Sequence, residues 1–365
     1  MARLKEYNGH YCESEYEYAF IGFLEAEGWK YSSGNNIRRV TKRDVLIADD
    51  FKKFIADTNP DLTEDEVTQI YDNVRLVGAE SDFATLHKVY GWMVNGVQFT
   101  QQDGLPRMIP LIDFDNWDKN IFRVVNQFTV EYTNNGQKEN RRPDVLLFVN
   151  GMPLCVVELK NPANANATIY DAWEQINIRY WRDIPHLLHY CPLACISDGV
   201  KTRLGTVRTP YEHFYAWRRV TERDAVSTLP FAETETMIKG VYAPERFLEI
   251  FRDYIYFQDS IYDSDEVEIV CRYPQFFAAR LLKQSIIKSV VEKSGKGGTY
   301  FGATGCGKTY TMAFLARQLA LRCIDIPEIG SPTIILIVDR DELQKQGSKL
   351  FTKSKEFLNL GEVSV

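Results

Sequence analysis

The sequence predicts an α/β protein in two parts, a mixed β-sheet with helices on its faces followed by an incomplete parallel α/β domain. Two observations lead to this expectation. Residues 145–149 and 154–157 are two short apolar runs separated by Asn150-Gly151, the strongest short signal for a β-hairpin. Residues 302–309, GATGCGKT, form a glycine-rich loop between a short apolar approach and a helical run.

The totals restrict the class of protein. With 365 residues, 45% hydrophobic and 13% aromatic, the chain is globular and long enough for two domains. A net charge of −7 argues against a uniformly basic nucleic-acid binder but leaves room for a local basic channel. No apolar run suits a signal peptide or a membrane span, and seven scattered cysteines suit reduced thiols, so we expect a cytoplasmic protein. His189, Cys191 and Cys195 fit no common zinc spacing, and their flanks indicate a buried strand.

Local patterns predict the order of elements. The first domain is expected over residues 1–225, a linker with a connecting helix over 226–260, and the incomplete second domain over 261–365. The expected elements are a helix at 14–27 ending at Gly28, helices within 48–97 with a cap at Thr63–Glu66, a strand at 119–133 before a polar turn, the hairpin, a helix from Ala167 to Tyr180, a strand at 187–198 and a helix at 240–260.

Three charged residues flank the hairpin strands. Asp144 precedes the first strand, and Glu158 and Lys160 follow the second, with the turn at the other end. Glu158 and Lys160 share a face, and Asp144 joins it if residue 149 pairs with 153, whereas a strict two-residue turn would separate the acids. We therefore expect an odd-length loop or a bulge. Opposed carboxylates roughly 5 Å apart could share a divalent cation, and the alternative is a strand-end salt bridge of Lys160 with an acid.

The glycine-rich loop predicts ATP binding. Its sequence is G-x-x-x-x-G-K-[ST], in which backbone N–H groups surround the phosphates, Lys308 reaches the β/γ-phosphates and Thr309 offers a hydroxyl to Mg²⁺. The apolar run within 331–346 is expected to be the next buried strand of the same sheet. The candidate ATP-binding residues of the loop are Gly302, Thr304, Gly305, Cys306, Gly307, Lys308 and Thr309.

From about residue 120 to its end, the chain resembles the N-terminal part of the restriction, or motor, subunit of type I restriction-modification enzymes. Five segments carry the resemblance in the family's order: NQFTVEY with RRPDVLLFVNGMPLCVVELKNP, ISDGVKTRLGT with Trp217, RYPQ at 272–275, GGTYFGATGCGKTYTMAFLA, and VDRDELQKQ at 338–346. The resemblance implies a PD-(D/E)xK endonuclease fold followed by a partial RecA-like, superfamily 2 helicase domain.

The resemblance also implies roles for residues. Asp144 and Glu158 would hold Mg²⁺ with the Leu159 carbonyl, and Lys160 would position the attacking water. Gln275 would contact the adenine of ATP, and Asp339 and Arg340 would lie near the nucleic-acid track. Candidate supporting residues of the nuclease site are Glu17, Gln175 and Tyr180.

Two departures from the family pattern stand out. The family's Gln and Tyr are commonly four positions apart, whereas Gln175 and Tyr180 are five apart, so they would not share an α-helical face without a shift. No Asp-Glu-x-His/Asp box follows residues 338–346, so we expect a fragment that has no ATPase activity of its own.

The function implied is Mg²⁺-dependent cleavage of double-stranded DNA coupled to ATP-driven translocation. The partners implied are double-stranded DNA and the modification (methyltransferase) and DNA-specificity subunits of a type I complex. The alternatives are the restriction subunit of another ATP-dependent system or a repair helicase–nuclease, and a non-catalytic module that clamps DNA for a translocase.

Overall fold

The computed structural model of the chain describes residues 13–78, 80–101, 104–160, 168–226, 232–258, 266–338, 341–353 and 355–358. Contacts between residues divide the chain into two compact units. Unit 1 contains residues 1–220 and 225–248, and unit 2 contains residues 221–224 and 249–365. The division by contacts therefore falls within helix α9 (Pro244–Asp253), inside the stretch 226–260 expected to connect the two domains.

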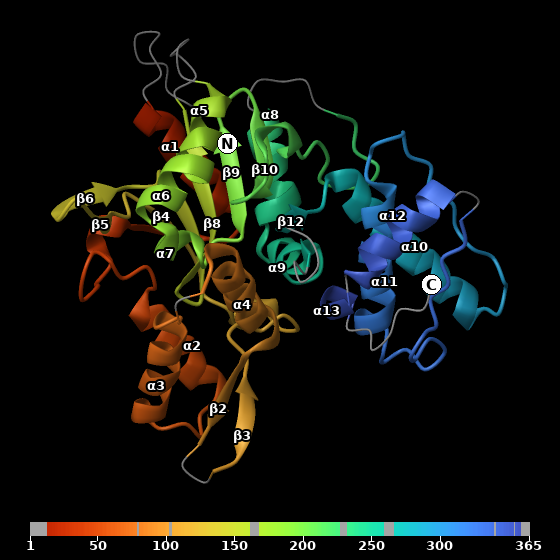
Figure 1. The fold of residues 1–365 in the computed structure, drawn as a ribbon, viewed down its shortest axis with the longest axis horizontal. Coiled ribbons are helices and arrows are strands. Elements are labelled where there is room, and N and C mark those ends of the chain that lie inside the picture. Colours follow the sequence, from red (N-terminus) through yellow and green to blue (C-terminus); the bar gives the residue numbers. More distant parts are fainter. Residues whose placement is uncertain are drawn as a thin grey trace. The chain divides into compact units, whose positions relative to one another are not determined.

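Unit 1 is built on a six-stranded mixed sheet with the strand order β1-β4-β7-β8-β9-β10 (Figure 1). The strands are β1 (Lys30–Ser33), β4 (Phe122–Asn126), β7 (Val145–Val149), β8 (Met152–Leu159), β9 (Leu193–Ser197) and β10 (Thr202–Thr206). β1 is parallel to β4 and β8 is parallel to β9, whereas the other neighbours are antiparallel. Every residue of β7, β8 and β9 is buried, which explains their continuous apolar sequences. The mixed α/β architecture predicted for this part is confirmed.

Unit 1 also contains helices outside the sheet. They are α1 (Glu13–Ala26), α2 (Ala48–Thr58), α3 (Glu64–Arg75), α4 (Asp82–Asn95), α5 (Ile169–Glu174), the π-helix η3 (Gln175–Tyr180), α6 (Trp181–Asp183), α7 (Pro185–Leu188), α8 (Ala232–Met237) and the π-helix η5 (Ile238–Tyr242), with 3-10 turns η1 (Gly34–Asn36), η2 (Trp117–Lys119) and η4 (Tyr211–His213). The predicted capping box is present, because the Thr63 side chain accepts from the N–H of Glu66 and Glu66 accepts from Thr63.

The hairpin of β7 and β8 has a two-residue turn and a bulge. Val149 pairs with Met152, so the predicted pairing of 149 with 153 is wrong, and Asn150 (φ 50°) and Gly151 (φ 77°) form the turn. The register shifts between Leu147 and Phe148, so that the open end of the hairpin pairs Val145 with Val157. The predicted alternative, a bulge, is confirmed. The register continued by one residue places Asp144 opposite Glu158.

Three further segments differ from the sequence prediction. Residues 119–133 form two strands, because Gln127 has a φ of 56° and ends β4, and β5 (Val130–Asn134) pairs with β6 (Gln137–Arg141). The strand predicted at 187–198 begins only at β9, because Pro185 starts the short helix α7 and Pro192 lacks an N–H. The hairpin of β2 (Val97–Thr100) and β3 (Pro106–Ile109) was not predicted.

Unit 2 is largely helical within the described residues. After α9 come the antiparallel strands β11 (Ile255–Gln258) and β12 (Val267–Val270), and then α10 (Tyr273–Val291), α11 (Lys308–Arg322), α12 (Asp341–Thr352) and α13 (Lys355–Leu358). The helix predicted at 240–260 is therefore shorter and gives way to β11.

The parallel sheet predicted for the second domain is absent from the described part of unit 2. Residues 299–301 and 331–338 join no ladder, and Ile335 and Ile337 are 77% and 88% exposed. A continuous apolar run predicts a buried strand only where neighbouring strands are present to pair with it, and the described residues contain none beside these runs.

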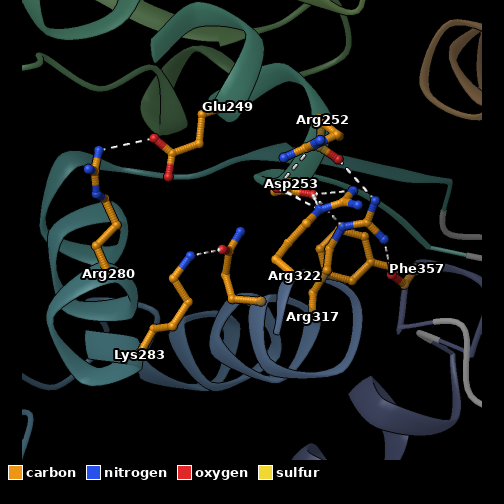
Figure 2. A network of polar contacts seen from close by, with 9 residues as sticks. Glu249, Arg252, Asp253, Arg280, Lys283, Arg317, Arg322 and Phe357 are labelled. Atoms are coloured by element: carbon orange, nitrogen blue, oxygen red, sulfur yellow. Dashed lines mark hydrogen bonds and ion pairs between the residues drawn. The ribbon is translucent and has the colours of Figure 1, made fainter. Parts of the chain in front are cut away.

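A charged network holds the helices of unit 2 together (Figure 2). Asp253, 1% exposed, accepts hydrogen bonds at 2.7, 2.9 and 3.1 Å from the guanidinium of Arg322 on α11. Arg317 of the same helix lies 3.5 Å from Asp253 and also donates to the carbonyl oxygens of Arg252 and Phe357. Glu249 pairs with Arg280 of α10 at 3.0 Å. The network joins α9, α10, α11 and α13 within this unit.

Candidate active site

The three charged residues around the hairpin meet at one edge of the sheet in unit 1. Asp144 stands at the entry to β7, and Glu158 and Lys160 stand at the exit from β8. Glu158 is fully buried, and its Oε2 lies 3.7 Å from Nζ of Lys160, whose side chain is 14% exposed. The bulge described above brings both acids and the amine to one face of this edge.

Two backbone contacts hold the ends of the strands. The N–H of Leu159 donates to Oδ2 of Asp144 at 2.7 Å, which fixes one carboxylate oxygen of Asp144 against the neighbouring strand. The N–H of Lys160 donates to the carbonyl oxygen of Ser197 at 2.8 Å, which extends the β8–β9 pairing beyond its last residue. These hydrogen bonds tie the chain that carries Asp144 to the end of β8, and the end of β8 to β9.

Glu158 is an acid in an unfavourable position for a charge. Burial, and then the nearby Asp144, raise the pKa of Glu158 well above its usual value. The hydroxyl of Tyr180 donates to its Oε1 at 2.5 Å, whereas its buried Oε2 accepts no hydrogen bond from the described residues. Burial and Glu158 also raise the pKa of Tyr180 well above its usual value, so Tyr180 stays a donor.

A π-helix joins Gln175 and Tyr180 to this centre. In the segment Gln175–Tyr180 the helix is wider than an α-helix, so residues five apart lie on one face. Nε2 of Gln175 donates to the Tyr180 hydroxyl at 2.8 Å, and its Oε1 accepts from Nζ of Lys160 at 2.9 Å. The spacing of five is therefore compatible with a shared face, and the π-helix is the shift that it requires.

Glu17 approaches the same edge from the other face of the sheet. Glu158 pairs with Ile196 of β9, and paired residues share a face of the sheet. The next residue, Ser197, therefore lies on the opposite face, where its hydroxyl is 2.7 Å from that of Tyr16 on α1. Glu17 accepts at 2.6 Å from Nδ2 of Asn126, a residue 1% exposed. Sequence reasoning missed Asn126, because its place beside Val145 depends on the pairing of β4 with β7.

The donor set fits Mg²⁺ better than a closed metal site. Among the described residues no three His, Cys, Asp or Glu side chains are grouped as a metal cluster. Mg²⁺ usually takes one or two carboxylates and completes its shell with water and substrate phosphates. Two adjacent carboxylates, one of them with a buried oxygen that accepts no hydrogen bond, match that pattern.

The glycine-rich loop of unit 2 is the second candidate site. Gly305 (φ 79°) and Gly307 (φ 80°) take backbone conformations that favour glycine, and α11 begins at Lys308. Nζ of Lys308 donates to the carbonyl oxygens of Gly302 at 2.9 Å and Ala303 at 3.0 Å, so its ammonium lies over the loop.

Gln275 reaches the same loop from α10. Its Nε2 donates to the carbonyl oxygen of Gly307 at 3.1 Å, and its Oε1 accepts from the N–H of Arg272 at 2.8 Å. Gln275 is 4% exposed. Asp339 and Arg340, expected near the nucleic-acid track, lie outside the described residues.

Comparison with known proteins adds independent information. A family model described as Type I restriction enzyme R protein N terminus matches residues 11–213, and a model described as SWI2/SNF2 ATPase matches residues 274–362. No helix in the described ranges has the length and apolar character needed to cross a membrane.

Curated proteins similar to this chain are named as endonuclease subunits of type I restriction enzymes. The chain is 29% identical over 365 aligned residues to the putative type I restriction enzyme MjaIXP endonuclease subunit of Methanocaldococcus jannaschii, covering 92% of this chain and 34% of the relative. It is 29% identical over 363 residues to the type I restriction enzyme HindI endonuclease subunit of Haemophilus influenzae, covering 95% and 33%. The chain thus spans about a third of the length of these relatives. Because the first family model covers more than half of the chain, the chain belongs to the family of type I restriction enzyme R proteins, whose N-terminal region it contains.

Proposed function

We propose that unit 1 is a Mg²⁺-dependent endonuclease of PD-(D/E)xK type that cleaves double-stranded DNA. The observation that carries the proposal is the arrangement of Asp144, Glu158 and Lys160 at one sheet edge, with Gln175 and Tyr180 holding Lys160 and Glu158 in place. Membership of the restriction enzyme family supports it.

In the proposed reaction Asp144, Glu158 and the carbonyl of Leu159 would hold Mg²⁺. The bound cation would supply Lewis-acid stabilisation of the charge that develops on the scissile phosphate. Lys160 would orient the attacking water and stabilise the same charge, and Gln175 would keep its ammonium directed at that place through the 2.9 Å hydrogen bond. Tyr180 would hold the Glu158 oxygen that faces it.

Unit 2 is proposed to bind ATP and to couple its hydrolysis to DNA translocation in the complete enzyme. The loop 302–309 would surround the phosphates, with Lys308 moving from its own loop carbonyls to the β/γ-phosphates and Thr309 assisting Mg²⁺. Gln275 would contact adenine, and its present hydrogen bond to Gly307 would then link adenine contact to the loop. The match to the SWI2/SNF2 ATPase model supports this part. Modification and DNA-specificity subunits are the proposed partners.

Titration with Mg²⁺ or Mn²⁺ tests the nuclease proposal on this chain. Wild type should bind the metal, and Asp144→Ala and Glu158→Ala should bind it at least tenfold more weakly while remaining folded. The matched control is Glu17→Ala, which removes an acid from the other face and should leave the affinity within about threefold. Equal metal binding by wild type and Asp144→Ala would reject the site.

A cleavage assay on the complete enzyme separates the nuclease from a non-catalytic clamp. Asp144→Ala, Glu158→Ala and Lys160→Ala should each abolish DNA cleavage and leave DNA-stimulated ATPase activity intact. Lys308→Ala should abolish ATP hydrolysis and cleavage together. Wild-type cleavage in the Lys160→Ala enzyme would contradict the proposed role of this lysine.

A further inference from the structure

A basic hollow lies along the flank of unit 1, outside the candidate active site. Its cavity has a volume of about 790 Å³. The walls come from the loop 38–46, from α2 and α3, and from the segment around α7. Its basic side chains are Arg38, Arg39, Arg43, Lys52 and Arg75. Three acids also line it, but Asp44 and Asp72 both pair with Arg75, at 3.6 and 3.2 Å, which leaves Asp49.

The loop that carries the arginines is anchored by Arg39 and Asp44. Arg39 turns inward, where its guanidinium donates to the carbonyl oxygens of Asp44 at 3.0 Å and Thr129 at 2.9 Å and lies 3.8 Å from the ring centroid of Phe128. The N–H of Thr41 donates to Asp44 at 2.9 Å. With Arg39 used to hold the loop, Arg38 and Arg43 remain exposed and make no ion pair within the described residues.

The loop that lines the hollow connects the two ends of the central strands. The loop leaves β1 at Ser33, whose Cα partner is Asn126 at the edge that carries Asp144 and Glu158. It ends at Ile47, whose N–H donates at 2.8 Å to Gly151 in the hairpin turn at the opposite edge. Five strand residues span roughly 17 Å. Phosphates of one DNA strand are about 3.4 Å apart along the helix axis, so a duplex lying along this flank would place about five base pairs beside it.

The wall contains a buried nitrogen without a hydrogen-bond partner. Nε2 of His186 is buried and has no partner among the described residues. Burial, Arg43 and His189 lower the pKa of His186 to about 4, so the imidazole is neutral at pH 7 and can donate from one nitrogen. The two tyrosines of the wall are already engaged, because Tyr71 packs on Phe51 and the Tyr190 hydroxyl donates to Val74. Neither tyrosine is therefore free to stack on a base, and the His186 nitrogen is closed to solvent, so contacts to phosphate oxygens fall to the exposed Arg38 and Arg43.

We propose that the basic hollow holds the phosphate backbone of the DNA duplex next to the part that is cut, with Arg38 and Arg43 as the phosphate contacts. This inference rests on the proposed nuclease function. It adds a second, non-catalytic contact that orients the duplex along the flank of the sheet, and phosphate contacts of this kind set register without reading sequence.

Binding of the 365-residue chain to a short duplex in EDTA tests the proposal without cleavage. Arg38→Gln with Arg43→Gln should weaken binding roughly tenfold at low salt, equally for duplexes of different sequence, and should reduce the slope of log affinity against log salt by about 2. The matched control is Lys88→Gln with Lys239→Gln, which removes two charges from surface ion pairs elsewhere in unit 1 and should leave the slope unchanged. Wild-type affinity and slope in the arginine variant, or no DNA binding by the wild-type chain, would overturn the proposal.

Two further measurements separate the sources of phosphate and the two proposals. Equilibrium dialysis with inorganic phosphate should show no stoichiometric site; phosphate binding that is lost in the arginine variant, with DNA binding unchanged, would make the hollow a small-anion site and overturn the DNA assignment. Asp144→Asn should retain the wild-type salt slope in EDTA. If the arginine variant also lost metal binding at Asp144, the hollow would not be a contact separate from the active site, and the proposal would be overturned. If only the metal titration failed, the proposed nuclease function would be rejected and the proposed DNA contact in the hollow would stand.

Discussion

Gln175 and Tyr180 lie five positions apart, and their side chains meet through a hydrogen bond of 2.8 Å because the residues between them form a π-helix. The extra residue of this turn is absorbed without moving either side chain from the face that meets Glu158 and Lys160. π-Turns are rare in proteins, and those that occur are often found at functional sites.

Deleting Ile178 should convert the π-turn into an α-helix and retain metal binding. Ile178 is 48% exposed, and its removal gives a spacing of four, at which side chains share an α-helical face. We expect metal affinity within about threefold of wild type in a calorimetric titration. An alanine inserted after Ile178 is the control, because a spacing of six should separate the pair and weaken binding at least tenfold. Equal loss of metal affinity in both variants would mean that the spacing of Gln175 and Tyr180 does not determine metal binding.

The stability of the metal-free protein should fall as pH rises above the usual range of a glutamate. The raised pKa of Glu158 means that the folded state favours the protonated acid, so this contribution is complete below the unfolded value of 4.5 and is lost as pH rises through the folded pKa. The slope is at most about 1.4 kcal/mol per pH unit. Urea unfolding from pH 5 to 8 should show the decline, Mg²⁺ should reverse it, and Glu158→Gln should show neither effect.

Gly151→Ala should destabilise unit 1. Gly151 has a φ of 77°, and a Cβ there would clash with the carbonyl oxygen of Ile47. Backbone strain alone costs roughly 1–3 kcal/mol, and the contact adds to it. Gly91→Ala is the control, because Gly91 lies in α4 with nothing within 4 Å and should gain about 0.5–1 kcal/mol. Tryptophan fluorescence in urea can follow both, and an unaffected Gly151→Ala protein would contradict the turn geometry.

Asp253→Asn should destabilise unit 2 and leave unit 1 unchanged. Burial alone would raise the pKa of Asp253, but Arg322, Arg252 and Arg317 outweigh it and lower the pKa below its usual value. Its contribution is therefore present above pH 3.8 and lost as pH falls through the lower folded pKa. Breaking such a buried pair costs roughly 3–5 kcal/mol at pH 7.

Tryptophan fluorescence reports on unit 1 alone, whereas far-UV circular dichroism reports on both units. All six tryptophans lie in unit 1, at positions 29, 92, 117, 173, 181 and 217. In Asp253→Asn, far-UV circular dichroism should show an earlier transition, and tryptophan fluorescence should not. A shift of the fluorescence transition by the same amount would show that the units unfold together.

The elements that the sequence predicts well are those with complete local signals. The capping box of Thr63 and Glu66 and the Asn150-Gly151 hairpin are recognised within four residues or fewer, and both form. The hairpin has the bulge that was predicted as an alternative, with a two-residue turn in place of a three-residue loop. The strand at 331–338 fails because its apolar pattern depends on neighbouring strands that no local signal can supply.

The candidate site is predictable in its residue types but not in its geometry. Asp144, Glu158 and Lys160 stand at the ends of strands that are visible in the sequence. The bulge at Leu147 and Phe148 and the π-turn after Gln175 are both one-residue irregularities, and each leaves the hydrophobic pattern almost unchanged. Asn126 is found only once the pairing of β4 with β7 is known.

The bulge in the hairpin determines which single-residue deletions and insertions the candidate site can tolerate. The turn end of the hairpin pairs Val149 with Met152 and the open end pairs Val145 with Val157, which leaves Leu154 outside the register. A chain that lost Leu154 would form a regular hairpin in which Asp144 still lies opposite Glu158. One residue added or lost elsewhere in either strand would shift the register by one and place the two acids on opposite faces. Loss of the bulge is therefore compatible with the candidate site, and single-residue changes elsewhere in the two strands are not.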